Sequence, residues 1–105
     1  MTAPDDAGLI DAVRTALKMV IDPELGQNVV DLGMVYAITV SDGCIVNITM
    51  TTTTRGCPAT DYIRQGIEEC AWRVDGVELV NVTLTYDPPW SPAMIAPEVA
   101  DLLGL

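Results

Sequence analysis

The sequence contains no histidine, and only five of its 105 residues are lysine or arginine. The absence of histidine excludes Cys-His catalysis, Ser-His-Asp catalysis and every zinc site that uses histidine. Fifteen acidic residues bring the net charge to -10, which repels nucleic-acid phosphates and anionic membrane surfaces. We therefore expect no nucleic-acid partner and no membrane partner.

Long apolar runs and a signal peptide are also missing. No apolar run approaches the roughly 20 residues of a membrane span, and the N-terminus lacks the basic and apolar regions of a secretory signal. The three cysteines are odd in number, have no CxxC spacing and do not make the disulfide framework of a small secreted domain. We expect a cytoplasmic protein with reduced thiols.

The hydrophobic pattern predicts one small domain over residues 1–105, with its core in about 8–104. Helical spacing of apolar residues predicts helices over 8–20 and from Pro58 to Val74, and a short last helix over 98–103. Alternation predicts strands over 29–40, 44–51 and 80–86, with a hairpin turn at Ser41-Asp42-Gly43. The order α-β-β-α-β, plus a short C-terminal helix, predicts a two-layer α/β (α+β) domain: a three-stranded mixed sheet covered on one face by two helices.

One segment stands out as a candidate site: Met50-Thr-Thr-Thr-Thr-Arg-Gly-Cys57-Pro58 is predicted to lead from a strand into a helix. A thiol beside a helix N-terminus faces unpaired N–H groups and the positive end of the helix dipole, and both favour the thiolate. Cys57 is therefore the candidate functional thiol, and a merely structural loop cysteine is the alternative. Cys44 and Cys70 fall on apolar faces and are predicted to be small core residues.

Polar side chains near this segment have two interpretations each. The hydroxyls of Thr51 and Thr53 either lie beside Cys57 and bind a ligand, or simply line the solvent face of a strand. Asp22 and Glu24 follow the first helix and are either solvated loop carboxylates or part of the site. The sequence leaves both pairs open.

Several motifs occur in one order along the chain: Asp22-Pro-Glu-Leu-Gly26, Asn28-Val-Val-Asp-Leu-Gly33-Met-Val-Tyr36, Met50-Thr51, Gly56-Cys57-Pro58 and Asp87-Pro-Pro-Trp90. Together they closely resemble the SufT and PaaD-like family of iron-sulfur cluster assembly domains, over about residues 8–104. The resemblance implies an α/β domain that serves in the maturation of iron-sulfur proteins, with Cys57 as its functional thiol. It also implies that Asp22, Glu24, Thr51 and Thr53 surround that thiol.

The resemblance implies that Cys57 holds iron or an iron-sulfur cluster as transient cargo. We expect no tightly bound cluster, because a cluster needs about four thiolates and the chain offers one well-placed cysteine. A homodimer or a hetero-complex would supply the missing ligands, so the expected partners are the iron-sulfur assembly machinery, client apoproteins and a second copy. Thr52 and Arg55 stand where the family often has leucine and proline. The PaaD branch typically carries a cysteine-rich C-terminal extension, and its absence here favours the general maturation role over a PaaD-like subunit for a multicomponent oxygenase.

Two other classes of function remain. In a cysteine-dependent enzyme, Cys57 is the nucleophile and Glu24 or Asp22 the base, although the lack of histidine weakens this alternative. In a pure adaptor, Trp90 and the Pro88-Pro89 segment form an exposed anchor, unless Trp90 simply closes the core. We expect an assembly or carrier factor rather than an enzyme.

Overall fold

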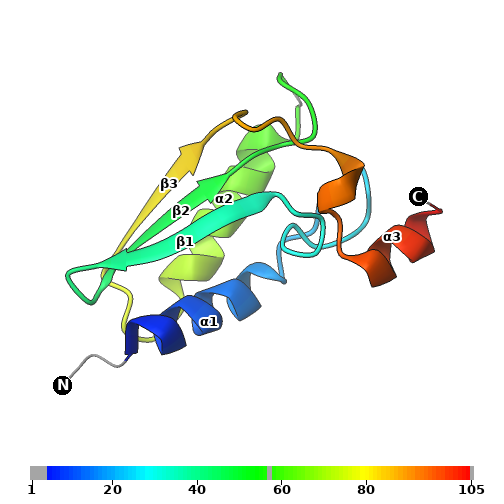
Figure 1. The fold of residues 1–105 in the computed structure, drawn as a ribbon. Helices are drawn as coiled ribbons and strands as arrows, with labels where there is room; N and C mark the ends of the chain where they lie inside the picture. Colours follow the sequence, from blue (N-terminus) through cyan, green and yellow to red (C-terminus); the bar gives the residue numbers. More distant parts are fainter. Residues whose placement is uncertain (1–4, 57, 105) are drawn as a thin grey trace.

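The computed structural model describes residues 5–56 and 58–104. Its elements follow the order α1 (Asp5–Leu17), β1 (Val35–Ser41), β2 (Ile45–Met50), α2 (Thr60–Trp72), β3 (Leu79–Leu84), a 3-10 turn η1 (Pro92–Met94) and α3 (Pro97–Leu103). Figure 1 shows α1 and α2 beside the sheet, with α3 at the opposite end of the molecule from the start of α1. The predicted order of helices and strands is confirmed. Within the described residues, no helix has both the length and the apolar character needed to cross a membrane.

The sheet is mixed, as predicted, and its strand order is β1-β2-β3. β1 and β2 form an antiparallel hairpin, whereas β2 and β3 pair in parallel because α2 carries the chain back between them. Asp42 and Gly43 have φ angles of 53° and 75°, as a tight hairpin turn requires, and the N–H of Cys44 donates to the carbonyl of Ser41. The predicted hairpin turn is therefore confirmed.

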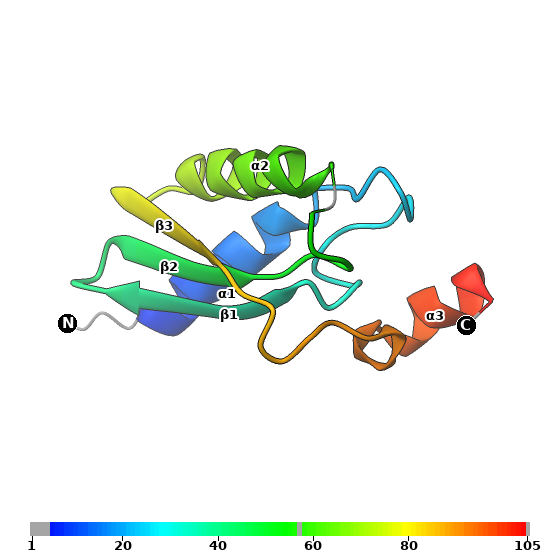
Figure 2. The same ribbon diagram turned by 90° about the horizontal axis from the view of Figure 1, so that it is seen from above.

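The core lies between the sheet and the two long helices. α1 packs on β1, α2 packs on β3, and the two helices contact each other, as the view from above shows (Figure 2). Fully or nearly fully buried side chains come from both helices and from the sheet and include Val13, Leu17, Val46, Ile48, Ile63 and Ile67. One apolar face per strand and one apolar stripe per helix are thereby removed from water.

The uncovered face of the sheet is polar. Asn47 donates from its side-chain amide to the hydroxyl of Ser41 at 2.8 Å, and Asn81 donates to the side-chain oxygen of Asn47 at 3.1 Å. These bonds run across all three strands, from Ser41 on β1 through Asn47 on β2 to Asn81 on β3. The polar side chains on this face therefore satisfy one another.

Several predicted element boundaries are wrong, and three of these errors lie near the candidate site. α1 ends at Leu17 rather than near residue 20, and Val20 is buried just after the turn that follows the helix. Residues 29–33 form turns rather than the start of a strand, and β1 begins at Val35. α2 begins at Thr60, so Pro58 precedes the helix instead of occupying its first position.

Candidate functional site

Three connecting segments gather at one end of the sheet, where β1 begins and β2 and β3 end (Figures 1 and 2). They are the segment after α1, the segment between β2 and α2, and the segment after β3. These segments contain all the residues that the sequence predicts for the functional site. Cys57 itself lies outside the described residues.

Asp22 builds the turn that carries Glu24. Its side chain is 1% exposed, and Oδ1 accepts hydrogen bonds from the N–H groups of Glu24 at 2.7 Å and Leu25 at 3.3 Å. Its carbonyl accepts a further bond from the N–H of Gly26 at 2.8 Å. The carboxylate therefore closes a turn in the manner typical of aspartate, and the turn holds Glu24 at the exposed surface.

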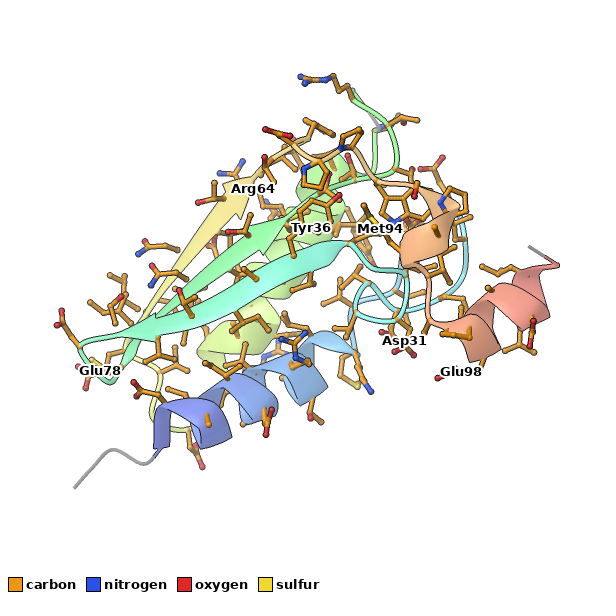
Figure 3. All side chains as sticks on the ribbon, in the orientation of Figure 1. Asp31, Tyr36, Arg64, Glu78, Met94 and Glu98 are labelled. Atoms are coloured by element: carbon orange, nitrogen blue, oxygen red, sulfur yellow. The ribbon has the colours of Figure 1, made fainter. Side chains whose placement is uncertain are left out.

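Asn28 and Asp31 brace the next part of the same segment. The Asn28 amide donates to Oδ2 of Asp31, and the Asp31 N–H donates to Oδ1 of Asn28, each at 2.9 Å. The carbonyl of Asp31 accepts the N–H of Ala96 at 2.7 Å. Asp31 thus ties this segment to the chain that leads into α3 (Figure 3).

The segment after β3 is fastened to the start of β1, and we call residues 87–96 the C-terminal strap. Trp90 donates its indole N–H to the carbonyl of Leu32 at 2.7 Å, and its ring packs against the core. Tyr36 donates its hydroxyl to the carbonyl of Pro88 at 2.7 Å and lies beside Met94 (Figure 3). Trp90 therefore closes the core, which favours the structural alternative over an exposed adaptor anchor.

The threonine segment is largely buried. Thr51 is 0% and Thr52 is 1% exposed, whereas Thr53 is half-buried. The N–H of Thr51 donates to the carbonyl of Met34 at 2.8 Å. Of the two predicted ligand-binding threonines, Thr53 is thus the more accessible.

Tyr86 holds the chain that leads to Cys57, a role that no sequence pattern indicates. Its hydroxyl lies 2.9 Å from Oγ1 of Thr52, which itself donates to the carbonyl of Thr54 at 2.9 Å. Because the Thr52 proton is used in that bond, Tyr86 is the donor to Thr52. The guanidinium of Arg55 lies over the Tyr86 ring, 4.6 Å from its centroid, as in a cation–π contact.

We expect Tyr86→Phe to lower the free energy of unfolding by about 1 kcal/mol, because it removes the hydrogen bond to Thr52 and keeps the ring under Arg55. Urea unfolding of Tyr86→Phe, Thr52→Val and the double variant measures the coupling between the two side chains. Additive losses would contradict the bond. Arg55→Ala serves as the control for the ring contact alone.

The start of α2 lacks a side-chain cap. Ala59 is the N-cap residue and provides no side-chain hydrogen bond to the first N–H groups of the helix. The hydroxyl oxygen of Thr60 is buried and has no hydrogen-bond partner among the residues that the structure describes. This is the helix end next to Cys57 in the sequence.

The two described cysteines, which we predicted to be core residues, have different environments. Cys44 is half-buried at the start of β2 and is absent from the apolar core, so that prediction is wrong for Cys44; Cys70 is half-buried but packs against the core. Burial, together with the carboxylates of Glu78 and Asp42, raises the pKa of the Cys44 thiol. The Cys44 thiol therefore stays protonated at neutral pH when no metal is bound. Among the described residues, no three cysteine, aspartate or glutamate side chains are grouped to hold a metal ion.

The comparisons with known proteins agree with this fold. Residues 10–84 match the family described as iron-sulfur cluster assembly protein, and the chain belongs to this family. It is 39% identical over 94 residues to an Fe-S protein maturation auxiliary factor of Porphyromonas gingivalis, covering 90% of this chain and 89% of that protein. It is 33% identical to the Fe-S protein maturation auxiliary factor SufT of Staphylococcus aureus, covering 83% of this chain and 99% of that protein.

A solved structure shows the same fold. The crystal structure of a domain of unknown function from Bacillus anthracis superposes with a TM-score of 0.91 at 31% identity, covering 99% of each chain. The predicted fold class and the resemblance to SufT-like assembly domains are therefore confirmed.

Proposed function

We propose that this protein is an accessory factor in iron-sulfur cluster assembly or delivery and that Cys57 provides a transient ligand for iron or a cluster, which is its cargo. The observation that carries the proposal is the family membership, since the matched region spans residues 10–84 and includes Cys57. Relatives covered over most of their length are named maturation auxiliary factors rather than enzymes. This supports an assembly role over a cysteine-dependent enzyme.

The remaining ligands come from another protein. A cluster needs about four thiolates, and Cys44 lies just before β2, at the opposite end of the sheet from the segment between β2 and α2. The second cysteine, Cys70, packs against the core on α2. A scaffold protein, a client apoprotein or a second copy of this chain would therefore complete the coordination, and the complex would form in the cytoplasm.

The other predicted site residues divide into two roles in this proposal. Asp22 and Thr51 are buried and shape the segments around the thiol. Glu24 is exposed and Thr53 half-exposed, so these two are placed to contact the cargo or the partner. A PaaD-like role in maturing a multicomponent oxygenase would use the same residues and would differ only in the client.

The test is rescue of a deletion strain by wild-type, Cys57→Ser or Cys44→Ser protein at matched abundance. We expect the activities of several iron-sulfur enzymes to fall on deletion, while cluster-free control enzymes stay unchanged. Wild type and Cys44→Ser should restore them, and Cys57→Ser should not. Full rescue by Cys57→Ser would overturn the role of the thiol, and unaffected iron-sulfur enzymes in a strain without a redundant homologue would overturn the maturation role itself.

A further inference from the structure

A surface groove runs between the segment that follows α1 and the outer side of α2. It encloses about 260 Å³. The residues after α1 form one wall, with Met19, Val20 and Ile21. Successive turns of α2 form the other wall, with Tyr62, Gly66 and Glu69. None of the contacts that fasten the C-terminal strap involves these residues.

The groove exposes three large apolar side chains. Met19 is 78%, Tyr62 is 62% and Ile21 is 43% exposed. Gly66 of α2 faces Val20, and a Cβ atom at this position would come within 3.1 Å of a Val20 methyl group, so a larger residue would crowd the two walls. Apolar side chains that remain exposed beside a hollow are typical of a protein-binding surface.

Acidic side chains predominate at the groove and on the adjacent surface of α2. Among the described residues, Glu69 is the charged side chain in the groove lining. The neighbouring surface of α2 adds Asp61 and Glu68 against one cation, Arg64. The whole chain carries a net charge of -10. A second copy would bring like charges together, whereas a basic partner would gain from the same field.

We propose that this groove binds a segment of a partner protein in which apolar side chains are flanked by lysine or arginine. The apolar side chains fill the space between Met19, Ile21 and Tyr62, and a cation pairs with Glu69. Tyr62 lies in the first turn of α2, five positions after Cys57 in the sequence. The identification of this partner as a client or scaffold rests on the proposed function; the binding itself does not.

A labelled synthetic helical peptide with leucines at positions i and i+4 and flanking lysines is a suitable probe for the full chain. Fluorescence anisotropy should show that the peptide binds and that its affinity falls with added salt. The same peptide with glutamates in place of the lysines should bind about tenfold more weakly. Met19→Gln and Tyr62→Ser should each weaken binding by about tenfold. Leu102→Gln is the matched control, because Leu102 is 76% exposed on α3, outside the groove, and this variant should bind as wild type does.

The proposal is overturned if the lysine peptide does not bind, if the two peptides bind equally, or if Met19→Gln and Leu102→Gln have equal effects. Self-association of the chain that Met19→Gln abolishes would identify a second copy as the occupant and would also overturn it. The assay contains no iron, and Cys57→Ser should bind the peptide normally. Iron-sulfur enzymes that are unaffected by deletion, together with intact peptide binding, would thus count against the proposed function alone. A wild-type chain that restores those enzymes but does not bind the peptide would count against the groove alone.

Discussion

Gly33→Ala is expected to lower the free energy of unfolding by about 3 kcal/mol, for two reasons that add. Gly33 has a φ of 76°, a left-handed conformation that residues with a Cβ atom adopt at a cost. A Cβ atom at this position would also overlap the backbone carbonyl of Met94, which cannot move aside as a flexible side chain can. Urea unfolding followed by circular dichroism measures the loss.

Gly26→Ala provides the matched control for Gly33→Ala. Gly26 has a similar φ of 72°, but no atom lies within 4 Å of the position that a Cβ would take. It should therefore lose only about 1 kcal/mol, the cost of the backbone conformation. Equal losses in the two variants would mean that the contact between Gly33 and the C-terminal strap does not matter for stability.

Trp90→Ala is expected to lower the free energy of unfolding by about 3 kcal/mol, because it removes a large side chain packed against the core. It also leaves the carbonyl of Leu32 without the indole N–H. Trp90→Phe retains most of the packing and should lose about 1 kcal/mol, the contribution of the hydrogen bond. Urea unfolding of both variants separates the two contributions.

Trp72→Ala is the control for Trp90→Ala, since Trp72 is 44% exposed on α2 and its loss should be smaller. A Trp90→Ala protein as stable as wild type would show that Trp90 does not close the core. This result would favour the adaptor hypothesis, in which Trp90 is an exposed anchor.

The elements with long, regular patterns were predictable from the sequence, whereas those governed by turns were not. The apolar residues Val29, Leu32 and Met34 predict a strand, yet Val29 and Leu32 are buried from turns and Met34 is buried just before β1. Val20 continues the spacing of Val13 and Leu17, so the pattern predicts a longer helix. Its carbonyl instead accepts the N–H of Val29, a contact between segments that periodicity does not reveal.

The candidate site was predictable only in part, for a similar reason. Asp22 was identified from its motif, but its use in the turn depends on the N–H groups of Glu24 and Leu25. The pairing of Tyr86 with Thr52 depends on the parallel alignment of β3 with β2 and joins residues 34 positions apart. No local pattern encodes such a pairing. Predicting it requires the strand register first.

The hydrogen-bonded polar side chains on the open face of the sheet restrict how two copies of this protein can associate. Stacking the sheets of two molecules would take Asn47 and Asn81 out of water without offering them new partners, since they already bond to each other. Such a dimer would gain little apolar contact, and removing the amide groups from water would cost binding free energy. Stacked sheets are therefore a weak interface, and we expect two copies of this chain, where they associate, to meet through another surface.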